Sequence, residues 1–549
     1  NGERDIVLLA GTERVFIDGV ELVRGIDNDY IIDYAAAEIL FQPRRAITPF
    51  NEIVVDFEYR LRRYSRSLLA ASHSVDFIDS SLRIGVGWMR EADDPDAPID
   101  LTYDDADRLL LAAAGADPNG AIRPGERFVG RSDTLSGSYR RVDSLIDGIS
   151  IIVWVFDPLA TDALYDVSFS EAVGGLGDYR SVAFGRYEYV GPGRGSYLPV
   201  IYLPLPESQQ VATLSLDWQP SGAATTLFGE VALGTANRNR FSDLDGVATN
   251  GLALNGGFRT SVDTLTVGSL ALGNIAIDGS VRFVDGNFVP IGRITPAEFD
   301  REWNTSGRTG ETGADDLIGE GRLQWSPFTP FRIETSIGRL VRGDIFASTR
   351  QSYRLGYGSP SHRLSFDLST SLIDSRDTLL DGGGLASHWT KLGGRVGYRI
   401  GRVTPAFVVT YQEREDRRAG IDTLVPGAFR FTEAGPDLLL DLPIFRTTVS
   451  ARLRLDDSVR FDPDRGLSDF LADSRSMTVS ARGELLGSRT LRSRLDLSWR
   501  SRQFDSIPSE LTPRLDNTTI LARSETTWRP VGDGLTLTAV YDVQTERAA

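Results

Sequence analysis

Few residues of this chain are suited to acid–base or nucleophilic chemistry. There are three histidines, His73, His362 and His388, and no cysteine. A hydrolase triad needs a histidine base beside a nucleophile, and the Gly-x-Ser-x-Gly elbow of many hydrolases is absent. Thiolate metal sites are excluded because they require cysteine. His362 falls in an expected turn and His388 begins an expected strand, so we predict surface roles for both and a protein that is not an enzyme.

Two other segments offer groups that bind ions. The run from Asp93 to Asp100 supplies carboxylates, but it lacks the glycine and the final glutamate of an EF-hand calcium loop. The run from Gly191 to Ser196 is rich in glycine, yet it leads into Tyr-Leu-Pro and not into a helix whose N-terminus could hold a phosphate. We interpret the first as a solvated acidic linker and the second as a tight turn. We expect no metal and no cofactor.

Arginine supplies nearly all the positive charge of this chain, and many of its arginines recur at every second position of an expected strand. Lys391 is the only lysine among 59 basic residues. In the segment 491–500 uncharged residues alternate with residues that are charged except for Ser498, and alternate side chains of a strand point to opposite faces. The arginines that lie opposite an uncharged face in this way are Arg322, Arg332, Arg354, Arg363, Arg395, Arg399, Arg452, Arg454, Arg482, Arg492, Arg494, Arg500 and Arg523.

Two interpretations of these arginines remain open. If the uncharged faces contact lipid, the arginines line a lumen, where a row of cations would favour anionic solutes. Alternatively, they pair with carboxylates on neighbouring strands and only fill and hydrate the interior.

The elements that must carry these residues are strands. From Leu364 to Leu372 every second residue is uncharged, and the residues between them are serines and an aspartate. Such faces extend over about ten residues, which spans a bilayer when the strand is tilted. The longest strongly apolar run, Ile149 to Phe156, is too short for a transmembrane helix. The pattern predicts an all-β fold, a transmembrane antiparallel β-barrel of roughly 16 strands or more over residues 209–549.

The connections of this barrel fall into two kinds. Three short turns share a Trp-x-Pro pattern, at Trp218, Trp325 and Trp528, and tryptophan at a strand end suits the headgroup layer of a membrane. We therefore predict that these residues belong to a membrane girdle. The long connections are polar, and in such barrels the long loops lie outside the cell. They are 285–314, 373–387, 414–428, 457–474 and 502–516.

The first 200 residues differ from the rest. The sequence pattern of residues 1–62 predicts a small, β-sandwich-like domain with a hairpin about Asp18-Gly19. Residues 63–92 fit either a first barrel hairpin or a part of that domain. Residues 93–208 predict an inserted or plug-like segment with β structure and one short helix. That helix has a capping box at Thr102-Tyr-Asp-Asp105 and ends at Gly115.

Several of these segments resemble a family of large, uncharacterised outer-membrane proteins of Bacteroidota and Chlorobi-type bacteria. The similar motifs are Gly11-Thr-Glu-Arg-Val-Phe-Ile-Asp-Gly19, Asp29-Tyr-Ile-Ile-Asp-Tyr34, Val54-Val-Asp-Phe-Glu-Tyr59, Gly177-Asp-Tyr179, Tyr189 to Tyr197 and Phe299-Asp-Arg-Glu-Trp-Asn304. The Asp-Tyr-x-x-Asp-Tyr module is also similar to one in the translocon of type IX secretion. The resemblance implies a location in the outer membrane and no particular chemistry.

We therefore expect a barrel in the cell outer membrane that acts as a channel, an export component or a surface scaffold. Its partners would be outer-membrane lipid and small solutes or an exported protein. The net charge of −17 argues against a nucleic-acid partner. The alternatives are a secreted all-β adhesin or carbohydrate-binding protein and, third, a hydrolase carried on a barrel.

Overall fold

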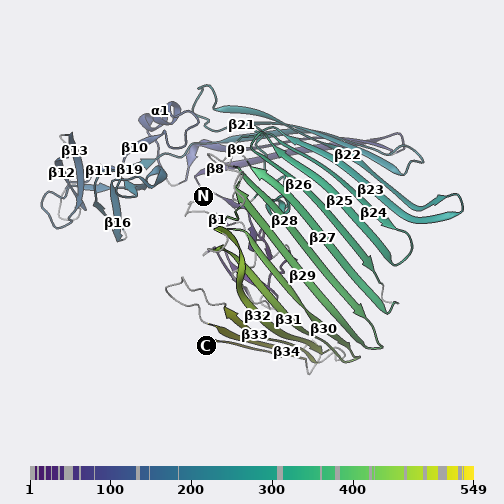
Figure 1. The fold of residues 1–549 in the computed structure, drawn as a ribbon. Coiled ribbons are helices and arrows are strands. Elements are labelled where there is room, and N and C mark those ends of the chain that lie inside the picture. Colours follow the sequence, from purple (N-terminus) through teal and green to yellow (C-terminus); the bar gives the residue numbers. More distant parts are fainter. Residues whose placement is uncertain are drawn as a thin grey trace.

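A closed antiparallel β-barrel of eighteen strands dominates the computed structural model (Figure 1). The structure describes residues 7–8, 11–17, 20–25, 28–34, 37–41, 53–60, 63–79, 81–99, 101–130, 137–146, 149–183, 185–305, 313–358, 362–377, 384–418, 423–425, 427–462, 466–485, 491–504, 516–529, 535 and 537–548. Among these residues, no helix has the length and apolar character needed to cross a membrane.

Two separate stretches of the chain form the barrel. The order around the ring is β20 to β35, then β8 and β9, which pairs with β20. The strands are β8 (Tyr64–Phe77), β9 (Leu82–Pro98), β20 (Ser208–Trp218), β21 (Thr225–Asn237), β22 (Ala248–Val267), β23 (Leu270–Val284), β24 (Asp316–Ser326), β25 (Phe331–Arg342), β26 (Phe346–Tyr357), β27 (Leu364–Asp377), β28 (Leu385–Tyr398), β29 (Val403–Arg418), β30 (Phe429–Asp441), β31 (Phe445–Asp462), β32 (Leu467–Leu485), β33 (Leu491–Phe504), β34 (Asn517–Trp528) and β35 (Leu537–Ala548).

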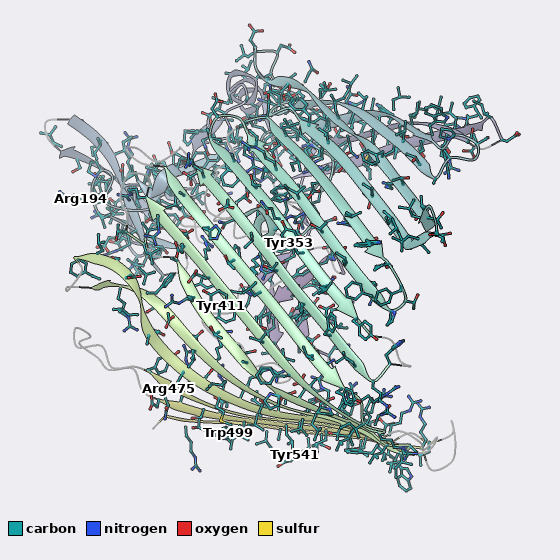
Figure 2. All side chains as sticks on the ribbon, turned by 45° about the vertical axis from the view of Figure 1, so that its right-hand side comes forward. Arg194, Tyr353, Tyr411, Arg475, Trp499 and Tyr541 are labelled. Carbon is teal, nitrogen blue, oxygen red and sulfur yellow. The ribbon has the colours of Figure 1, made fainter. Side chains whose placement is uncertain are left out.

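The alternation in the sequence places apolar side chains on the outside of this barrel. Leu368 is 41% exposed, Val396 47% and Leu453 52%, which would be unfavourable in water. Trp499 and Tyr541 likewise point away from the barrel in Figure 2. Strands of a barrel satisfy their backbone hydrogen bonds by pairing with their neighbours, so such a wall is stable in hydrocarbon. The predicted fold class is confirmed, and the protein is an outer-membrane β-barrel. The apolar faces do not pack between two sheets, so the soluble two-sheet fold that the adhesin alternative assumed is not formed.

Several strands continue beyond the apolar belt, where the sequence predicted loops. Strand β27 reaches Asp377, β29 reaches Arg418 and β31 reaches Asp462. Their outer faces are charged there, and ion pairs join neighbouring strands. His388 Nδ1 lies 2.6 Å from Asp374 Oδ1, and Arg430 Nε lies 2.6 Å from Asp457 Oδ2. The predicted loops 373–387, 414–428 and 457–474 are therefore too long, because backbone pairing continues where the apolar alternation ends.

The N-terminal domain consists of three small sheets. They are β1 (Val7–Leu8) with β7 (Tyr59–Arg60); β2 (Arg14–Ile17) between β3 (Val20–Glu21) and β6 (Ile53–Asp56); and β4 (Tyr30–Asp33) with β5 (Glu38–Phe41). Ile17 pairs with Val20 across the predicted hairpin, whose turn residues 18–19 lie outside the described residues. Val15, Ile17, Leu22 and Tyr30 form the core of this domain. Its purple strands lie within the outline of the barrel in both figures.

An insert between β9 and β20 projects beyond one rim of the barrel (Figure 1). Two four-stranded sheets enclose a core around Tyr139, Trp154 and Tyr179. The first sheet consists of β11 (Glu126–Phe128), β14 (Tyr165–Val167), β12 (Tyr139–Ile146) and β13 (Ile149–Phe156), and the second of β15 (Ser170–Glu171), β18 (Tyr197–Leu198), β16 (Tyr179–Ala183) and β17 (Arg186–Tyr189). A third sheet pairs β10 (Ile122–Pro124) with β19 (Val200–Tyr202), and a short 3-10 helix spans Val173–Gly175.

The insert contains the predicted helix, α1 (Asp105–Ala113), with a shifted cap. Asp104, and not Thr102, is the N-cap residue, and its side chain accepts a hydrogen bond from the backbone N–H of Asp107. Gly115 follows the helix with a φ of 62°, a conformation that glycine adopts readily.

The acidic run before α1 is not a linker. Strand β9 continues to Pro98, six residues past the expected boundary at 92, and Asp93 is buried in an ion pair with Arg66 at 2.6 Å. The run Gly191–Ser196 is a turn, as predicted, and the Gly193 N–H donates to Asp178 Oδ1 at 3.0 Å.

Candidate functional site in the barrel lumen

Residues 285–305, which we call the inner strap, run along the inner wall of the barrel. The strap follows β23 and includes the short helix α2 (Phe299–Trp303). Phe288 covers Gly234 and Gly251, and Arg282 donates a hydrogen bond to the carbonyl of Ile294 at 2.9 Å. The sequence predicted this segment as part of an external loop. It turns inward because its aromatic side chains bury apolar surface against the wall.

Helix α2 packs against three strands. Phe299 and Trp303 form a buried cluster with Ile318, Leu340 and Phe346, from β24, β25 and β26. These three apolar residues of the inner face form the docking point for the helix. A Cβ atom on Gly338 would lie 2.7 Å from Trp303 Cη2, so glycine is required there for close contact.

Polar contacts fix the end of the strap. Asn304 is 2% exposed, and its Nδ2 donates to Ser387 Oγ at 2.8 Å and to Ser375 Oγ at 3.0 Å. Its φ of 55° lies in the left-handed region, which asparagine tolerates better than most residues. Arg350 bridges Glu302 of the strap and Glu320 of β24 at 2.5 and 2.6 Å. The strap therefore contacts the wall from β21 to β28.

An apolar cavity of about 630 Å³ lies between the strap and the strands on one side of the lumen. Its wall is made of small inward residues, including Ala70, Gly87, Ala232 and Ala253. Phe288, Pro290, Ile291 and Ile294 of the strap line it from the other side.

A second cavity, of about 650 Å³, lies between the N-terminal domain and strands β24 to β29. Val20 of the domain lines it together with serines and threonines of the wall. Its basic residues are Arg301, Arg322, Arg350, Arg354 and Lys391, and its acidic residues are Glu302 and Glu334. The domain also contacts the strap directly through an ion pair between Asp56 and Arg293. The lumen thus has an apolar side and a side rich in cations.

The thirteen predicted arginines are distributed in three ways. Five have carboxylate partners on the wall: Arg354 with Asp367 at 3.8 Å, Arg395 and Arg452 with Asp437 at 4.0 and 2.6 Å, Arg454 with Asp456 at 2.7 Å, and Arg482 with Asp496 at 2.6 Å. Six others also lie on strands of the wall: Arg322, Arg332, Arg492, Arg494, Arg500 and Arg523. In the backbone register, Arg494 is opposite Glu525 and Arg523 is opposite Asp496. Arg363 and Arg399 lie just beyond the ends of β27 and β28 and join through a backbone hydrogen bond of 2.7 Å.

The three predicted girdle tryptophans lie at the rim with the short turns. Trp218 is 41% and Trp528 48% exposed, and the Trp325 Nε1–H donates to the carbonyl of Leu272 at 2.8 Å. Phe77 and Tyr398 are exposed at the same rim.

His388 has contacts like those of a triad histidine. Its Nδ1 lies 2.6 Å from Asp374 Oδ1 and its Nε2 lies 3.2 Å from Thr390 Oγ1. The backbone register places Leu372 and Glu413 on either side of Thr390. A carboxylate beside the nucleophile would repel the oxyanion of an acyl-transfer reaction, which needs hydrogen-bond donors. This arrangement does not favour a hydrolase.

No group of residues suited to a metal ion occurs in the described part of the chain. The alternation of the strands identified the arginine-rich face, but sequence reasoning missed the inner strap, the apolar cavity and Asn304. One signal was available: Gly251 and Gly338 interrupt inward faces, and glycine within a strand often marks the close approach of another segment.

Comparisons with known proteins give one match to a family model, at the N-terminus, and distant matches to solved structures. A domain of unknown function, DUF8818, matches residues 1–61, and no curated protein matches the chain. Among solved structures, the copper transporter OprC is 10% identical, with a TM-score of 0.31, over 90% of this chain and 73% of its own. The ferric preacinetobactin receptor BauA from Acinetobacter baumannii is 8% identical, with a TM-score of 0.24, over 98% and 72%. OccAB4 from Acinetobacter baumannii is 10% identical, with a TM-score of 0.26, over 64% and 93%.

Proposed function

We propose that this barrel is a channel or transporter that passes small anionic solutes across the outer membrane. The observation that carries the proposal is the second lumen cavity, where five basic side chains face two acidic ones. Serine and threonine hydroxyls on the same wall can replace part of the water around a solute.

The physical basis is the field inside a narrow lumen. Charges on the wall of a pore with low-dielectric surroundings act over a longer range than they do in bulk water. Arg322 and Arg354 face this space, and Arg354 Nε is held only loosely, at 3.8 Å from Asp367 Oδ1. Their positive potential would raise the local concentration of anions and lower that of cations.

Conductance in planar bilayers under a salt gradient tests this proposal. The wild type should give discrete current steps with a reversal potential that shows anion preference. Arg322→Gln and Arg354→Gln together should reduce this preference by at least about twofold, because each removes one wall charge. Arg475→Gln is the matched control, since Arg475 lies on the outer face of β32 and should leave selectivity unchanged. Cation preference in the folded wild type would contradict the proposal, and a folded barrel without current would favour a scaffold role.

A further inference from the structure

The apolar cavity beside the inner strap is unusual for the inside of a barrel whose inner wall is mostly polar. Four neighbouring lumen positions carry side chains no larger than a methyl group: Ala70, Gly87, Ala232 and Ala253. These come from β8, β9, β21 and β22, so the wall is recessed on both sides of β20, whose Val211 and Thr213 also line the cavity. The strap covers the recess with apolar side chains but does not fill it, and about 630 Å³ remains. That volume lies within the usual range of small-molecule sites.

One charged group on the cavity lining has no partner among the described residues. Glu230 of β21 lines the cavity and is exposed within it, and no described residue forms an ion pair or hydrogen bond with its carboxylate. Its register neighbours are Ser215 and Asn255, which carry no charge. The other charged lining residue is Arg282, whose guanidinium already donates to Ile294 and lies 5.8 Å from the centre of the Phe299 ring.

We propose that this cavity is a binding site for small apolar or aromatic molecules that carry one cationic group. The apolar body occupies the recess between Ala232, Ala253 and Ile294. The cation lies against the Glu230 carboxylate. The cavity lies apart from the cation-rich side of the lumen, so this site does not depend on conduction of anions by the barrel.

Binding of three matched probes to the purified barrel in lipid nanodiscs tests the site. The probes are naphthylmethylamine, naphthylmethanol and naphthoate, which share an aromatic body and differ in charge. Calorimetric titration should show tightest binding for the amine and weakest for the carboxylate. Ala232→Phe and Ala253→Phe fill the recess, and each should reduce binding of the amine by at least about tenfold. Partition into the lipid is the same for every variant, so a difference between variants reports on the cavity.

The charge is tested separately. Glu230→Gln should weaken binding of the amine by about fivefold, as expected for one exposed charge pair, and leave naphthylmethanol within about twofold. Glu334→Gln is the matched control, because Glu334 lines the second cavity and should not affect either probe. Heat-modifiable migration on gels verifies that each variant is folded.

Three results would overturn the inference. Equal binding by the wild type and both folded phenylalanine variants would show that the cavity is not the site. Unchanged amine binding in Glu230→Gln would show that the carboxylate does not select cations. Conductance without probe binding would support the proposed channel and contradict this binding site. Probe binding without conductance would support the binding site and contradict the proposed channel.

Discussion

At the scale of single residues, the inner strap depends on a few close contacts. Trp303 meets a glycine at 338, and Asn304 reaches two serines on neighbouring strands. The sequence around Gly338, Ser375 and Ser387 does not reveal which residues they contact in the folded protein. The alternation predicted which face of β25 points inward, but it could not show that a segment after β23 returns to cover that face.

Replacement of Gly338 by alanine tests the contact with Trp303. The new Cβ would lie 2.7 Å from Trp303 Cη2, so we expect the strap to shift and to lose about 1–3 kcal/mol of its attachment to the wall. Limited proteolysis of the folded barrel should then cut the strap faster than in the wild type. Gly319→Ala is the control, because a Cβ atom added there would have no neighbouring atom within 4 Å. Equal cleavage of the two variants would refute the contact.

His388 allows a second test at this scale. Because Glu413 lies opposite Thr390, we expect no esterase activity beyond background, and His388→Ala should leave that background unchanged. The esterase activity of each protein is measured as the release of fatty acid from phospholipid vesicles. Activity that disappears in His388→Ala but persists in His362→Ala would establish the hydrolase alternative.

At the scale of elements, the sequence correctly predicted those helices, hairpins and strands that depend on local sequence patterns. The short helix, the hairpin about residues 18–19 and the wall strands follow from caps, turn residues and alternation. The ends of β27, β29 and β31 were missed because charged residues occupy both faces there, and such residues also occur in loops. The inner strap was missed because it is fixed by tertiary contacts with residues far along the chain.

The insert should unfold at high pH through Tyr179. Burial raises the pKa of Tyr179 from 10.0 to about 12, although the Trp154 N–H donates to its hydroxyl at 2.9 Å. A raised pKa means that folding favours the neutral phenol. The stabilisation is therefore complete below pH 10 and is lost as the pH rises through about 12.

Ultraviolet absorbance of tyrosinate and near-ultraviolet circular dichroism would follow this transition. Tyr179→Phe should remove one late-titrating tyrosine and make the insert less sensitive to alkali, while Tyr139 and Tyr189, whose pKa values burial also raises, remain. An insert that unfolds at the same pH in both proteins would show that another group governs the transition.

At the scale of the whole molecule, the chain enters and leaves the barrel at one rim. Tyr64 pairs with Pro98 and Asn517 pairs with Ala548, so the N-terminal domain, the insert and the end of β35 share the rim opposite the short turns. The tryptophans mark the short-turn rim. In barrels of this kind short turns face the periplasm, which would place the insert outside the cell.

Labelling of intact cells tests this orientation. Arg194 is exposed at the projecting end of the insert (Figure 2), and the chain has no cysteine, so Arg194→Cys would provide a single thiol. A membrane-impermeant maleimide should label it on intact cells. Labelling that requires disruption of the outer membrane would reverse the orientation.

The central claim is that residues 285–305 lie inside the barrel, against its inner wall. Oxidative cross-linking of Asn304→Cys with Ser387→Cys measures this directly, since Asn304 Nδ2 lies 2.8 Å from Ser387 Oγ and no native cysteine competes. We predict that this pair forms a disulfide in native membranes, whereas Asn304→Cys with His388→Cys does not, because His388 lies on the outer face of the same strand. A disulfide in the second pair, or none in the first pair within a folded barrel, would contradict the account.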